Sequence, residues 1–149
     1  MQVCKLQILV LDFAGLCVLP EPLTQLCSLR QLSLRGNELV TLPPGPYLKY
    51  VILLNLGEQG SANSPPTLPS IPMVLAAATA LEYFGMYPPF DDEMAPGPLN
   101  LPFYSPSNSD ISLLSQLPLL KVLRFTTCSG DGHALPVLHA NQAIAQLAA

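Results

Sequence analysis

Leucine recurs at regular positions in the first third of the chain. In the stretch LRQLSLRGNELVTLP, residues 29–43, leucine occupies positions 29, 32, 34, 39 and 42, and a proline follows. Shifting this stretch by 23 positions toward the amino terminus places it on Leu6, Leu9, Leu11, Leu16, Leu19 and Pro20. A pattern that returns at a fixed period of about 20–50 residues is typical of a stacked repeat architecture.

The alternation inside each copy predicts a short strand. Leu32 and Leu34 share one face of an extended segment, and Ser33 between them faces the other way. Asn37 follows, and its side-chain amide offers both donors and an acceptor to the backbone of a turn. One such unit cannot bury its own apolar face, so it needs neighbours stacked on both sides.

Weaker copies continue the pattern toward the carboxyl terminus. The third keeps the phase of the second with one residue deleted, and Gln59 replaces the asparagine. In the fourth, the phrase LAAATALEYFGM is aligned so that Leu81 matches Leu32. The fifth has core positions at Leu114, Leu117, Leu120, Leu123, Phe125 and Cys128. Repeats are therefore predicted near residues 6–28, 29–50, 51–70, 75–86 and 114–134, with a truncated sixth at 135–149.

Proline-rich segments interrupt the later repeats. Residues 87–110, YPPFDDEMAPGPLNLPFYSPSNSD, are rich in Pro, Ser, Asn and Asp and are predicted to form a long loop insertion. A shorter segment of similar composition, GEQGSANSPPTLPS, precedes the fourth repeat. We expect residues 1–149 to form a single repeat domain that is incomplete at both ends.

These motifs resemble the leucine-rich repeat family. Residues 29–43 match its pattern Leu-x-x-Leu-x-Leu-x-x-Asn-x-Leu-x-x-Leu-Pro in full, and residues 6–20 match it well. The resemblance implies an α/β fold, a short solenoid that forms a right-handed arc with a parallel sheet on its concave face. It also implies that Asn37 is a structural turn residue, with Cys128 as the family's substitute for asparagine. The Ala- and Pro-rich phrase IPMVLAAATALEY is similar to repeat proteins of green algae or plants.

In the leucine-rich repeat family the outward positions of the strands form a concave binding face. Several of these positions are apolar here, and clustered apolar residues on a surface tend to mark interaction sites. The resemblance assigns partner binding to Ile8, Val10, Asp12, Gln31, Ser33, Arg35, Leu53, Asn55, Glu82, Phe84, Val122 and Arg124. Neighbouring repeats should place Asp12 beside Arg35, and Glu82 beside Arg124.

Composition narrows the classes of function. The chain is 50% hydrophobic and only 11% charged, which argues against global disorder. Its net charge is −4 and its six Lys and Arg residues are scattered, so no basic stripe is available for nucleic acid. No run reaches the roughly 20 apolar residues that a membrane-spanning helix needs, and we expect no membrane insertion. The four cysteines are interpreted as buried, reduced thiols.

Two groups of chemically active residues have simpler explanations than catalysis or metal binding. Cys128, Asp131 and His133 are close in sequence, but Cys128 falls on an inward strand-ending position and sequence proximity does not establish a catalytic site. The acidic run FDDEM lacks the alternate spacing and the glycine of a calcium loop. We therefore predict no catalytic residue, no metal site and no cofactor.

The predicted function is non-catalytic binding of another protein through the concave face. Self-association through the uncapped ends of the array is also expected, because terminal repeats expose apolar surface unless a polar face covers them. Alternatives are an ectodomain fragment of a secreted or receptor-type repeat protein, a truncated gene product without independent function, and an enzyme that uses Cys128 and His133. The predicted compartment is the cytoplasm, with the cytoskeleton or ciliary axoneme as the alternative and secretion less favoured.

Overall fold

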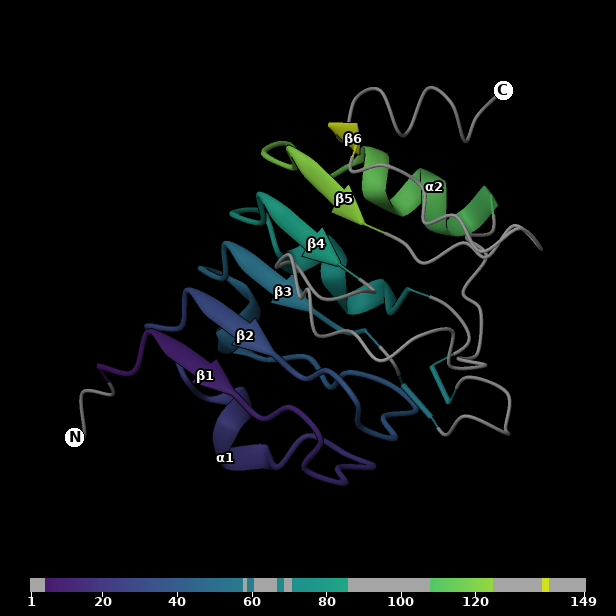
Figure 1. Cartoon of the computed structure of the whole chain (residues 1–149). Helices are drawn as coiled ribbons and strands as arrows, with labels where there is room; N and C mark the ends of the chain where they lie inside the picture. The colour runs from purple at the N-terminus through teal and green to yellow at the C-terminus, as the bar shows by residue number, and fades with distance from the viewer. Residues whose placement is uncertain are drawn as a thin grey trace.

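The computed structural model describes residues 5–57, 59–60, 67–68, 71–85, 108–124 and 138–139 of the chain. Within them, short strands alternate with single turns or short stretches of helix (Figure 1). The strands are β1 (Ile8–Val10), β2 (Gln31–Ser33), β3 (Leu53–Asn55), β4 (Tyr83–Gly85), β5 (Val122–Arg124) and β6 (Leu138–His139). The helical segments are α1 (Glu21–Thr24), η1 (Pro46–Leu48), η2 (Met73–Ala77) and α2 (Asn108–Ser115), of which η1 and η2 are 3₁₀ helices.

All six strands belong to one sheet, in the order of the sequence. Strands β1 to β5 run parallel, each paired with the next, and the α/β class expected from the repeats is confirmed at this level. Consecutive helical segments also contact one another, α1 with η1 and η2 with α2, on one side of the sheet (Figure 1). The chain therefore passes from strand to helical segment and back four times over the parallel part of the sheet.

Local sequence explains the short helical segments. Pro20 precedes α1 and a second proline lies in its first turn, where the missing N–H costs no hydrogen bond. Gly45 and Pro46 begin η1 in the same way, and Pro72 precedes η2. Asp110 lies in the first turn of α2, where a carboxylate is favoured by the helix dipole.

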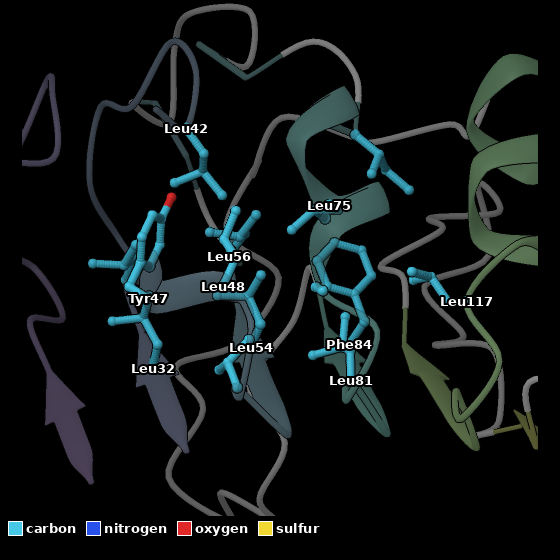
Figure 2. Close-up of a cluster of buried hydrophobic side chains, with 14 of the residues drawn as sticks. Leu32, Leu42, Tyr47, Leu48, Leu54, Leu56, Leu75, Leu81, Phe84 and Leu117 are labelled. Carbon is cyan, nitrogen blue, oxygen red and sulfur yellow. The ribbon is translucent and has the colours of Figure 1, made fainter. Parts of the chain in front are cut away.

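The core lies between the sheet and the helical segments (Figure 2). Residues at equivalent positions of successive strands stack in columns, since the strand register places Leu32 beside Leu54 and Leu54 beside Phe84. A second column, three residues earlier in each repeat, contains Leu29, Val51, Leu81 and Leu120, all buried. Each column buries apolar surface that a single repeat would leave in water, which contributes roughly 25 cal/mol per Å².

The predicted alignment of the fourth repeat is wrong by three residues. Leu81 was matched to Leu32, but the residue that occupies the Leu32 column is Phe84. Leu81 belongs instead to the column of Leu29, and Tyr83 faces outward beside Leu53 rather than inward. Apolar residues occur at every third position of LAAATALEYFGM, so the sequence fits more than one alignment with the repeat.

The last part of the chain differs from a further repeat. Strand β6 pairs with β5 in the antiparallel direction, with Leu138 opposite Leu123. Residues 138–139 thus add a strand to the sheet at a point where the truncated repeat would have a return segment. Most of the predicted loop insertion at residues 87–110 lies outside the described residues, and its last three residues form the first turn of α2.

Buried amides close the turns after the strands, as predicted for Asn37. The Oδ1 of Asn37 accepts hydrogen bonds from the backbone N–H groups of Ala14 and Leu16, at 3.1 and 3.0 Å. Its Nδ2 donates to the carbonyl groups of Leu11 and Leu34, at 2.9 and 2.8 Å. One side chain therefore joins the turn after β1 to the turn after β2.

Gln59 performs the same task one repeat later. Its Oε1 accepts a hydrogen bond from the N–H of Leu39 at 3.1 Å, and its Nε2 donates to the carbonyl of Leu34 at 2.7 Å. Both amides are buried, so the loss of either would leave backbone groups without partners away from water. The replacement of asparagine by glutamine preserves the link between repeats.

Candidate protein-binding surface

The outer face of the sheet, on the side away from the helical segments, is the candidate surface. It is formed by alternate strand residues, which the register places side by side in two rows. The first row is Ile8, Gln31, Leu53, Tyr83 and Val122, and the second is Val10, Ser33, Asn55, Gly85 and Arg124. The backbone hydrogen bonds of the sheet hold these positions at fixed spacing, independent of any partner.

Exposure decreases along this face from β1 toward β4. Ile8 and Val10 are 56% and 60% exposed, and Gln31 is also exposed. Leu53 and Tyr83 are half-buried, whereas Asn55 and Gly85 are buried. The accessible part of the face is therefore the region of β1 and β2, where two branched apolar side chains adjoin two polar ones.

A charged and aromatic group borders this region at the carboxyl ends of β1 and β2. The Oδ1 of Asp12 accepts hydrogen bonds from the Ser33 hydroxyl at 2.6 Å and from the Arg35 N–H at 3.0 Å. The guanidinium of Arg35 lies over the ring of Phe13, 5.2 Å from its centre, at a distance that favours a cation–π interaction. Asp12 and Arg35 are thus neighbours, as predicted, and the carboxylate holds the backbone of the adjacent repeat.

Basic residues border the opposite edge, at the amino-terminal ends of the strands. Lys121, which precedes β5, forms an ion pair with Glu82, which precedes β4, with the nitrogen and oxygen 2.8 Å apart. Arg30 precedes β2 and lies over the ring of Tyr50, which is close to the beginning of β3, 5.5 Å from the ring centre. Lys49 also lies over this ring, at 5.2 Å.

The structure corrects three of the predicted binding residues. Phe84 is completely buried, because it occupies the core column of Leu32 and Leu54. Glu82 lies one residue before β4, so its neighbour is Lys121, and Arg124 is paired instead with Gly85. Asn55 lies on the outer face but is 2% exposed, and its Oδ1 accepts a hydrogen bond from the N–H of Gly57.

Two residues that the sequence analysis omitted belong to the surface. Tyr83 takes the outward position between Leu53 and Val122, whereas the predicted alignment of the fourth repeat turns it inward. Tyr50 brings together Arg30 and Lys49, which the sequence analysis had described only as scattered basic residues. The spacing of 20 residues between Arg30 and Tyr50, close to the repeat period, is the signal that could have predicted this contact.

Cysteine placement is also different from the prediction. Cys17 and Cys27 are free thiols and both are exposed, so they are not core residues. Cys27 lies between the predicted core positions 26 and 29, on the outside of the segment that follows α1. The proposed turn position of Cys128, and the Cys128–His133 pair of the enzyme alternative, lie outside the described residues.

Comparison of the chain with protein-family models, with curated proteins and with solved structures finds no match in any of the three. Among the described residues, no helix has both the length and the apolar character needed to cross a membrane. The same part of the chain contains no group of three or more His, Cys, Asp or Glu side chains placed to hold a metal ion.

Proposed function

We propose that this chain is a short leucine-rich-repeat solenoid that binds a partner protein through the outer face of its sheet. Two features support the architecture. The parallel strands follow one another in sequence order with apolar columns beneath them, and buried amides join successive turns. The arc would be right-handed, as crossover connections between parallel strands are in nearly all proteins.

The observation that carries the binding proposal is the exposed region of β1 and β2. Ile8 and Val10 expose more than half of their surfaces on a face whose backbone is already ordered. Burial of such side chains by a partner would contribute about 1.5–3 kcal/mol each, with little further cost in backbone entropy. Gln31 and Ser33 next to them supply polar groups that can give the contact specificity.

The two free thiols of the described residues support the proposal that the protein functions in a reducing compartment. Cys17 and Cys27 are both exposed and unpaired, and exposed thiols persist where glutathione and thioredoxin keep them reduced. We accordingly propose the cytoplasm.

A pair of matched variants tests the binding proposal. The partner would be captured from native extract and identified by cross-linking mass spectrometry, with the wild type and with Ile8→Lys/Val10→Lys. The control is Val18→Lys/Val40→Lys, because Val18 and Val40 are 67% and 62% exposed and lie outside the strands. We expect a cross-linked partner to be lost only with the β1 variant. Equal capture by both variants would contradict the proposal.

A further inference from the structure

Three exposed side chains form a compact cationic cluster at the amino-terminal ends of β2 and β3. It consists of Arg30, Lys49 and Tyr50, and we call it the Tyr50 cluster. The guanidinium carbon of Arg30 is 5.5 Å from the centre of the Tyr50 ring, and the ammonium of Lys49 is 5.2 Å from it. Arg30 also donates a hydrogen bond from Nη1 to the Tyr50 carbonyl at 3.3 Å, which ties the segment before β2 to the segment before β3.

Both cations of the Tyr50 cluster lie within 5.5 Å of the centre of one ring, and the described part of the chain does not neutralise them. In that part, the ion pair that forms at this edge is Lys121–Glu82, whereas neither Arg30 nor Lys49 contacts a carboxylate. A single aromatic ring attracts both cations while they repel each other, so an anion that contacts either or both of them would lower the electrostatic energy. Within the described residues, the positive charges of Arg30 and Lys49 therefore have no carboxylate partner.

The distribution of charge over the sheet also favours an anion at the Tyr50 cluster. Of the chain's six basic residues, Lys5, Arg30, Lys49 and Lys121 precede strands, at the amino-terminal edge of the sheet. Asp12 and Glu38 lie at the opposite edge, after β1 and β2. The amino-terminal edge of the sheet is therefore locally positive on a chain whose net charge is −4.

We infer that the Tyr50 cluster binds a carboxylate side chain in an acidic segment of a partner protein. This inference rests on the proposed function and names the kind of partner. Arg30 can offer N–H groups not used on the Tyr50 carbonyl, in the planar fork that matches a carboxylate. Lys49 adds a second charge, and the Tyr50 ring provides an apolar floor. Two cations on an acidic chain suit a few carboxylates better than the phosphate backbone of a nucleic acid.

The test uses the ¹⁵N-labelled chain and a blocked pentaglutamate peptide, with a pentaglutamine peptide as the uncharged control. We expect the amide resonances of Arg30, Lys49 and Tyr50 to shift with pentaglutamate and not with pentaglutamine, and the shifts to decrease as salt is added. Arg30→Gln or Lys49→Gln should each weaken binding roughly two- to fivefold, the scale of one exposed ion pair. The double variant should abolish the shifts. Lys121→Gln is the matched control and should bind like the wild type.

Three outcomes would overturn the inference. They are equal shifts with pentaglutamine, pentaglutamate binding that survives in the Arg30→Gln/Lys49→Gln variant, and equal affinity for inorganic phosphate, which would indicate a simple anion site. The Ile8→Lys/Val10→Lys variant separates this inference from the proposed function. Peptide binding should persist in that variant even though partner capture is lost.

Discussion

At the scale of single residues, hydrogen bonding by side-chain amides joins the turns that follow successive strands. Asn37 was predicted from the sequence because its position after a leucine alternation needs a side chain that both donates and accepts. The equivalent role of Gln59 was harder to predict, since its longer side chain must fold back to reach Leu34 and Leu39. The structure shows that the extra methylene is accommodated in a buried site.

Replacement of Asn37 by alanine should be strongly destabilising. It would leave the N–H groups of Ala14 and Leu16 and the Leu11 carbonyl without the hydrogen bonds that the Asn37 amide supplies. Since each unsatisfied buried group costs about 1–3 kcal/mol, we expect the free energy of unfolding to fall by about 2–4 kcal/mol after partial compensation by water. Urea unfolding measures this change. Gln25→Ala, at an exposed position, is the control and should lie within about 0.5 kcal/mol of the wild type.

The buried hydroxyl of Tyr47 makes the free energy of unfolding decrease at alkaline pH. Burial raises the pKa of the Tyr47 hydroxyl, which donates a hydrogen bond to the Pro43 carbonyl at 2.7 Å. In the unfolded chain this group ionises near pH 10, so above that pH the unfolded state loses a proton that the folded state retains. Stability contributed by the neutral hydroxyl is therefore complete below about pH 10 and decreases as the pH rises further.

Urea unfolding at a series of pH values from 9 to about 11.5 tests this effect. We expect the free energy of unfolding of the wild type to decrease more steeply with pH than that of Tyr47→Phe, which lacks the ionisable group. Parallel pH profiles for the two proteins would show that the hydroxyl is not buried as described.

At the scale of elements, the sequence predicted strands better than it predicted their alignment. The outward positions of β1, β2, β3 and β5 were correct because the apolar residues there keep the spacing of Leu29, Leu32 and Leu34. Strand β4 was misplaced because LAAATALEYFGM has apolar residues at every third position, so both Leu81 and Phe84 fit the column of Leu32. The antiparallel β6 could not be predicted, since no pattern within Leu138–His139 indicates the direction in which it pairs.

The turns after β1 and β2 each contain a glycine in a backbone conformation that residues with a Cβ rarely adopt. Gly15 and Gly36 both have positive φ values, of 66° and 67°. A Cβ on Gly15 would meet nothing within 4 Å, whereas a Cβ on Gly36 would fall 2.2 Å from a ring carbon of Phe13. An alanine at either position would therefore strain the backbone. At Gly36 it would in addition clash with the Phe13 ring.

Alanine substitutions at these two glycines separate the two effects. Gly15→Ala should cost about 1–2 kcal/mol, the penalty of a left-handed conformation for a residue with a Cβ. Gly36→Ala should cost more, because the exposed Phe13 ring must also move and lose its position over Arg35. Thermal unfolding of both variants provides the comparison. Equal losses would mean that the ring moves aside without cost.

At the scale of the whole molecule, the end of the sheet at β1 is less well covered than its centre. Leu9 is only partly buried, whereas Leu32 and Leu54 at equivalent positions are 1% and 0% exposed. Within the described residues, β1 pairs with β2 alone, so the N–H and carbonyl groups of Ile8 and Val10 face away from the sheet. An apolar edge strand of this kind is prone to pair with another chain.

We therefore expect the protein to self-associate as its concentration rises. Sedimentation velocity should show an increase in average mass for the wild type. Val10→Pro should reduce it, because proline removes the outward N–H of an edge strand without removing a bond to β2. Val10→Lys is the second variant in case proline disturbs folding, and urea unfolding would confirm that either variant is folded. A wild type that stays monomeric at high concentration would contradict this expectation.

The sequential pairing of the strands has a mechanical consequence. Within the described residues, each parallel strand is bonded only to the strands before and after it in the sequence, so a force applied to the chain ends can peel the sheet from one end, strand by strand. The chain released at each event would differ in length, because the spacing is 23 residues from Ile8 to Gln31, 22 to Leu53, 30 to Tyr83 and 39 to Val122. At roughly 3.5 Å per residue, the first two intervals would release nearly equal lengths of about 80 Å. The intervals before β4 and β5 would release about 105 and 135 Å, and a stretching trace would distinguish these two steps from the others.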